Sequence, residues 1–115
     1  MADEMVIFAR TFDLLNWLLP QCEKFPKSQR YLVTQRLGDA ALDFQEAVFQ
    51  ANAQRGEQRL SHLRAADGYL TTLRLYLRMA FQWAWLTSGQ YEHVSNMVEE
   101  IGRLLGGWIR QTGVK

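Results

Sequence analysis

Five arginines between residues 55 and 86 are the side chains whose type and spacing suggest binding chemistry. They are Arg55, Arg59, Arg64, Arg74 and Arg78, and the same segment holds only two acidic residues. The planar guanidinium group matches the oxygens of a phosphate, so such a row could contact a nucleic-acid backbone. A solvated helix face, balanced by acidic residues of this and neighbouring helices, explains the row equally well. The residues alone leave both interpretations open.

Catalytic and metal chemistry find little support in the sequence. A carboxylate-bridged metal site in a helical bundle needs Glu-x-x-His pairs, but neither His62 nor His93 has a glutamate three positions earlier. Activation of Cys22 as a nucleophile would need a neighbour that lowers its pKa, and only Lys24 is close in sequence. The glycines of GRLLGGW lack the preceding strand of a phosphate-binding loop. We therefore expect no enzymatic activity, metal, cofactor or small-molecule substrate.

The arginines must be positioned by one long helix, which the sequence predicts over about residues 57–86. Its apolar seam advances in steps of three and four residues, which is helical spacing: Leu63, Ala66, Leu70, Leu73, Leu77, Ala80 and Ala84. At about 100° per residue, most polar side chains fall within one narrow arc. Nearly everything else is apolar or small, including Tyr69, Tyr76 and Trp83. Stacking on nucleic-acid bases is possible for these aromatics, but packing between helices or subunits is the favoured interpretation.

Three further helices are expected over about residues 3–24, 26–53 and 88–111. Pro26 suits a first helical turn, and Thr87 followed by Gln90 matches a capping box. The first helix has two apolar rows, of which we expect the first to be its core seam: Met5, Phe8, Phe12, Leu15 and Leu19, with Ile7, Leu14 and Leu18 as the second. In the last helix, Gly102, Gly106 and Gly107 suggest close approach of another backbone, with fraying toward Thr112 and Gly113 as the alternative.

Four helices with short connections predict an all-α fold, an up-down antiparallel four-helix bundle forming a single domain over residues 1–115. The apolar arcs of the first and third helices are wider than one packed face requires. Either several helices of the same chain or a second copy of it must supply the extra cover, and we expect part of it to lie outside the protomer's own core. The candidates for an interface with a second copy are Tyr69, Tyr76, Trp83, Ile7 and Leu14.

Composition and charge set the cellular context. Hydrophobic residues make up 48% of the chain and charged residues 22%, which argues against disorder. No apolar run reaches the roughly 18 residues of a membrane span. Asp3 and Glu4 do not suit a secretory signal, and the single Cys22 cannot form an internal disulfide. These features predict a cytoplasmic protein without a membrane partner.

Two motifs resemble a known family. The segments AADGYLTTLRLYLR (65–78) and VEEIGRLLGGWI (98–109) resemble the accessory variability determinant (Avd) proteins of diversity-generating retroelements. KFPKSQRY (24–31) is similar to a wider four-helix-bundle family that includes proteins encoded in intervening sequences of bacterial 23S ribosomal RNA genes. Together these segments carry a resemblance over nearly the whole chain.

The resemblance implies a four-helix protomer that assembles into a homopentameric, barrel-like ring without enzymatic activity. Avd proteins bind the retroelement's reverse transcriptase, associate with RNA and DNA, and support mutagenic copying of template-repeat RNA into cDNA for retrohoming. Arg74 and Arg78 occupy the two arginine positions of the family-like LRxxLR segment, whereas Arg64, Arg59 and Arg55 are added from the charge pattern. Family members tend to be strongly basic, but this chain has a net charge of only +1.

Two functions other than that of an Avd protein are also compatible with the sequence. The first is a self-assembling protein of the ribosomal intervening-sequence type, a module of unknown role. The second is a purely structural assembly module without a nucleic-acid partner. Neighbouring genes separate the first alternative from an Avd protein, and binding measurements separate the second.

Overall fold

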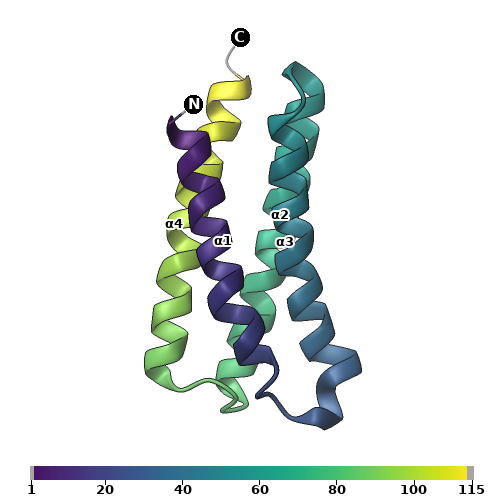
Figure 1. The fold of residues 1–115 in the computed structure, drawn as a ribbon, viewed down its shortest axis with the longest axis vertical. Helices are drawn as coiled ribbons and strands as arrows, with labels where there is room; N and C mark the ends of the chain where they lie inside the picture. Colours follow the sequence, from purple (N-terminus) through teal and green to yellow (C-terminus); the bar gives the residue numbers. More distant parts are fainter. Residues whose placement is uncertain (1, 114–115) are drawn as a thin grey trace.

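The computed structural model describes the backbone of residues 2–113 and the side chains of residues 6–113. Its four long helices are α1 (Ala2–Cys22), α2 (Gln35–Asn52), α3 (Gly56–Gln82) and α4 (Ser88–Gly113). They lie side by side and alternate in direction, so that α1 begins and α4 ends at the same end of the bundle (Figure 1). Each helix packs against its neighbours in sequence, and α1 also packs against α4. No strand occurs within residues 2–113, which confirms an all-α four-helix bundle.

The interior seam of α3 follows the predicted spacing up to Ala80. Six of the seven expected positions are buried: Leu63, Ala66, Leu70, Leu73, Leu77 and Ala80. They meet apolar residues of all three other helices in one continuous core. The exception is Ala84, which is exposed beyond the end of the helix. This part of the prediction was wrong because helical spacing continues past the residue at which the helix ends.

The predicted core seam of α1 is confirmed only in part: Leu15 is buried and Phe8 packs against the core, but the second row is buried more completely. Ile7, Leu14 and Leu18 are buried in the protomer core, whereas Phe12 is 57% exposed. Leu19 is also exposed, and Met5 lies outside the residues whose side chains are described. Both rows are apolar, so composition could not show which of their members pack against α2 and α4. Ile7 and Leu14 are each only 1% exposed, which corrects their assignment to a subunit interface.

The second helix begins later than the sequence suggested. Pro26 has φ −56° and ψ 132°, which are extended rather than helical angles. It is followed by a 3-10 turn, Lys27–Gln29, and a π-helical turn, Arg30–Thr34, before α2 starts at Gln35. No side-chain hydrogen bond caps either turn, and neither contains a buried residue. Without a cap or a packed apolar face, this segment lacks the interactions that would hold a regular first turn.

A chain reversal at Ala84 ends α3 and leads into α4. The Trp85 amide donates to the Ala80 carbonyl at 2.8 Å and the Ala84 amide donates to the Phe81 carbonyl at 3.0 Å. This pair of bonds defines a Schellman motif, and Ala84 takes its left-handed position with φ 64°. Three residues later the predicted capping box is confirmed: the Gln90 amide donates to Thr87 Oγ1 at 3.1 Å, and the Thr87 amide donates to Gln90 Oε1 at 2.9 Å.

Candidate functional site

A groove of about 530 Å³ lies between α3 and α4 and contains two of the predicted arginines. Its volume is within the range of about 300–1,000 Å³ that small-ligand sites occupy. Side chains from both helices line it: Thr71, Arg74, Leu75, Leu77 and Arg78 from α3, and Tyr91, Ser95, Val98 and Glu99 from α4. We call it the α3–α4 groove. The two family-like segments therefore meet at one surface, because α3 and α4 are antiparallel neighbours.

Arg74 crosses from α3 to α4 and lies against Gly102. A Cβ atom added to Gly102 would be 2.5 Å from Arg74 Nη2, closer than real Cβ contacts, and 3.6 Å from Leu70 Cδ2. The glycine thus provides the space in which the guanidinium lies. Gly106 and Gly107 have only the end of the Arg110 side chain nearby, at 3.6 and 3.8 Å from the added atoms. The expectation that another backbone approaches these glycines was wrong, because what approaches is an arginine side chain.

The charges of the α3–α4 groove are two arginines and one glutamate, a formal charge of +1. No ion pair found among residues 6–113 includes Arg74 or Arg78, and both side chains are exposed. Glu99 lies one helical turn before Arg103, and their closest oxygen and nitrogen are 3.7 Å apart. Both members of that pair are well exposed, so it adds little stability and leaves the carboxylate accessible.

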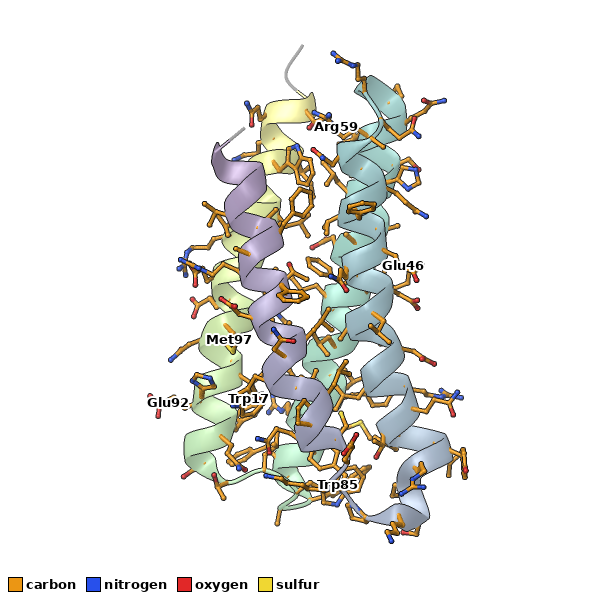
Figure 2. All side chains as sticks on the ribbon, viewed as in Figure 1. Trp17, Glu46, Arg59, Trp85, Glu92 and Met97 are labelled. Carbon is orange, nitrogen blue, oxygen red and sulfur yellow. The ribbon has the colours of Figure 1, made fainter. Side chains whose placement is uncertain are left out.

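The other predicted arginines do not belong to this groove. Arg59 turns toward the end of α2, where its Nε donates to the Ala51 carbonyl at 3.0 Å and its Nη2 donates to the Asn52 carbonyl at 3.5 Å. Its guanidinium carbon also lies 5.7 Å from the ring centre of the buried Trp108. Figure 2 shows Arg59 at the end of the bundle where α2 ends. Arg55 and Arg64 are exposed outside the groove. The structure therefore brings together Arg74 and Arg78 and gives Arg59 a capping role.

The α4 side of the groove was missed by sequence reasoning. Tyr91, Ser95 and Glu99 recur at four-residue steps, which places them along one side of α4. The Tyr91 ring stacks on Phe81 of α3, with ring centres 4.4 Å apart and planes at 6°. A polar row beside an apolar seam was the available signal. It could not show that α3, rather than solvent, lies next to that row.

A second surface feature is an apolar hollow of about 410 Å³ between α1 and α2. No charged residue lines it, and its lining is Phe8, Ala9, Thr11, Phe12, Gln45 and Phe49. We call it the α1–α2 hollow. Phe49 is 71% exposed, and the buried Thr11 hydroxyl has no hydrogen-bond partner within the described part of the chain. Of the aromatic residues predicted at a subunit interface, Tyr69 and Trp83 are exposed and Tyr76 is half-buried.

The described residues offer no further reactive or membrane-spanning feature. Burial raises the pKa of the Cys22 thiol to about 11, which disfavours the reactive thiolate. Within residues 6–113 no three side chains among His, Cys, Asp and Glu are grouped as metal ligands. None of the helices in the described segment is long and apolar enough to cross a membrane.

The fold and groove define the protein as an up-down four-helix bundle that presents two arginines between its third and fourth helices. The chain belongs to the bAvd-like family, whose model matches residues 5–112. This result confirms the resemblance carried by the motifs of α3 and α4. No curated protein matches the chain significantly.

The bundle is also similar to a solved structure. That structure is a protein of unknown function from the S23 ribosomal protein family of Bacteroides thetaiotaomicron, with a TM-score of 0.85. The match covers 94% of this chain and 98% of that chain at 14% sequence identity. At this identity the likeness establishes the shared fold.

Proposed function

We propose that this protein is a non-enzymatic accessory subunit of a diversity-generating retroelement. In this role it binds the retroelement's reverse transcriptase and template-repeat RNA and supports mutagenic cDNA synthesis and retrohoming. Membership of the bAvd-like family supports the assignment. The observation that carries it is the α3–α4 groove, where Arg74 and Arg78 stand together without an ion-pair partner among the described residues.

Phosphate contact is the chemistry that suits this arginine pair. Residues four apart on a helix are neighbours on its surface, so two guanidinium groups can reach one phosphate or two adjacent phosphates. The placement of Arg74 against Gly102 limits how much side-chain freedom it loses on binding. The groove has a formal charge of only +1. We therefore infer a local contact with RNA rather than strong, general affinity for nucleic acid.

Self-assembly completes the proposed role. The family resemblance implies a pentameric ring, and ring symmetry would repeat the α3–α4 groove on every protomer. Repetition strengthens the positive field that one weakly charged groove provides. The charge-free α1–α2 hollow, with Phe12 and Phe49 largely exposed, is the kind of surface that a neighbouring copy would cover. Tyr69 and Tyr76 on α3, together with Trp83 directly after its end, form the alternative surface for that contact.

Co-purification tests the proposed function. The tagged full-length protein is expressed with the reverse transcriptase encoded beside it, and the complex is recovered at moderate salt with the template-repeat RNA. We expect both partners to be recovered with the wild-type protein. Absence of the transcriptase from the purified material would refute the proposal. A gene located inside a 23S ribosomal RNA gene, with no adjacent transcriptase, would favour the ribosomal intervening-sequence alternative.

A further inference from the structure

The α3–α4 groove contains a carboxylate that phosphate binding alone does not explain. Glu99 lines the groove together with Arg74 and Arg78. A carboxylate is negatively charged and has only hydrogen-bond acceptors, so it repels a phosphate and pairs with a donor group of a bound molecule. Its contact with Arg103 is 3.7 Å long and exposed, which leaves acceptor positions open. A ligand that fits all three charged groups must therefore combine a phosphate with a nearby hydroxyl or amino group.

The charge and the lining residues of the groove further restrict the chemical class of this ligand. A formal charge of +1 matches the single negative charge of a phosphodiester better than the higher charge of a terminal phosphate or polyphosphate. Hydroxyl groups of Tyr91 and Ser95 add polar contacts along α4, and Leu75 and Val98 provide an apolar surface. The sugar–phosphate backbone of RNA carries a 2′-hydroxyl close to each phosphodiester, and DNA lacks it.

We propose that the α3–α4 groove binds a ribose–phosphate unit of RNA and distinguishes it from DNA. Arg74 and Arg78 contact the phosphodiester, and the Glu99 carboxylate accepts a hydrogen bond from a ribose 2′-hydroxyl. This inference rests on the proposed function, because it requires RNA to bind at the arginine pair. It adds the specificity-determining residue Glu99, on the helix opposite the arginines.

The test compares one single-stranded sequence of adenine and cytosine made as RNA, as DNA and as 2′-O-methyl RNA. These probes separate the ribose hydroxyl from the bases, which are the same in all three. The wild-type protein is expected to bind RNA about tenfold more tightly than DNA, the size of one hydrogen bond to a charged group. The 2′-O-methyl probe, which cannot donate from that position, should bind like DNA.

Two glutamate substitutions on α4 provide the matched comparison. Glu99→Ala is expected to reduce the RNA-to-DNA affinity ratio to about one, while Glu92→Ala preserves the wild-type ratio. Glu92 is exposed, does not line the groove, and points away from the bundle in Figure 2. Both substitutions remove one negative charge from the same helix, so both can strengthen binding to every probe. Only the ratio reports the 2′-hydroxyl contact.

The outcomes separate this inference from the proposed function. If Glu99→Ala leaves the ratio unchanged while Arg74→Gln with Arg78→Gln weakens RNA binding, the role of Glu99 is refuted and the RNA site stands. Equal affinity of the wild-type protein for all three probes would also refute the role of Glu99 and leave the RNA site in place. A wild-type protein that binds none of them refutes both. Circular dichroism of each variant establishes that a changed ratio does not come from unfolding.

Discussion

The guanidinium group of Arg74 occupies the space beside Gly102 that a side chain at that position would fill. Arg74 belongs to the first family-like segment and Gly102 to the second, so the contact joins the two segments across the α3–α4 interface. The glycine has a stability cost, because glycine inside a helix is about 1 kcal/mol less favourable than alanine. If Arg74 contacts RNA as proposed, a substitution at Gly102 should affect binding more than folding.

Gly102→Ala should therefore separate stability from RNA binding. The added methyl group displaces the flexible end of Arg74, while the helix gains up to about 1 kcal/mol in propensity. We expect an unchanged or higher melting temperature together with RNA affinity reduced by up to about tenfold. Gly106→Ala is the control, since its added Cβ would meet only Arg110 at an ordinary 3.6 Å. Equal RNA affinity for the two variants would show that Gly102 does not position Arg74 for binding.

Replacing Arg74 and Arg78 together with glutamine should change the salt dependence of RNA binding. Each phosphate contact to a single strand contributes about −0.7 to the slope of log affinity against log salt, so the loss of two contacts should make the slope shallower by about 1.4. Fluorescence anisotropy over a range of salt concentrations measures it. Arg36→Gln removes an exposed arginine from α2 and should alter the slope less. An unchanged slope in the double variant would identify the pair as a solvated face.

Ala84→Gly is expected to stabilise the protein. Ala84 has φ 64° in the Schellman motif that ends α3, a conformation that glycine adopts without the penalty of a Cβ atom. The gain should be about 1 kcal/mol, which thermal unfolding would report as an increase of a few degrees in the melting temperature. Ala65→Gly, at an exposed position inside α3, should be destabilising by a similar amount. A lower melting temperature for both variants than for the wild type would contradict the left-handed conformation of Ala84.

Residue 84 also shows where prediction from sequence reached its limit. Spacing identified the buried face of α3 through Ala80, because one row of that helix is clearly more apolar than its polar arc. It could not detect the end of the helix, because alanine at the turn continues the same pattern. In α1 both rows are apolar, and packing against α2 and α4 buries Ile7 and Leu14 together with Leu15 of the other row.

The residues of the candidate site could likewise be predicted from the sequence only in part. Arg74 and Arg78 could be selected from their family-like positions on one helix. Tyr91, Ser95 and Glu99 could not, because their role depends on which helix lies beside α4. The sequence placed Arg59 in the basic row and could not show its capping role. The backbone carbonyls of Ala51 and Asn52 come close to Arg59 only because the chain turns back from α2 to α3.

The Cys22 thiol predicts a specific loss of stability at alkaline pH. Burial raises its pKa from 9.0 to about 11, so folding favours the protonated thiol. The contribution of the protonated thiol to the free energy of unfolding is fully present below pH 9. It is lost as the pH rises through about 11, where Cys22 ionises in the folded protein as well. Urea unfolding between pH 8 and 11 should show a steeper decline for the wild type than for Cys22→Ala. Parallel declines would show that this thiol ionises equally in both states.

Phe49→Glu tests whether the α1–α2 hollow is covered by another copy of the chain. Phe49 is 71% exposed in the protomer, so the substitution should leave the helical content and the protomer core intact. A charge in a surface that contacts another apolar surface loses its hydration without gaining a partner, which opposes association. We expect light scattering to show assemblies for the wild type and monomers for Phe49→Glu at micromolar concentration.

Two further variants locate the subunit interface. Tyr31→Glu is the matched control, because Tyr31 is also largely exposed, at 79%, but lies on the π-helical turn outside the hollow. It should assemble like the wild type. Trp83→Glu introduces the same charge into the set of Tyr69, Tyr76 and Trp83, which we call the α3 row although Trp83 directly follows the end of α3. If Trp83→Glu produces monomers and Phe49→Glu does not, the α3 row is the subunit interface and the α1–α2 hollow is free for a different partner. If the wild-type protein is monomeric, the proposed ring is refuted. The stronger positive field that repeated α3–α4 grooves would provide is refuted with it.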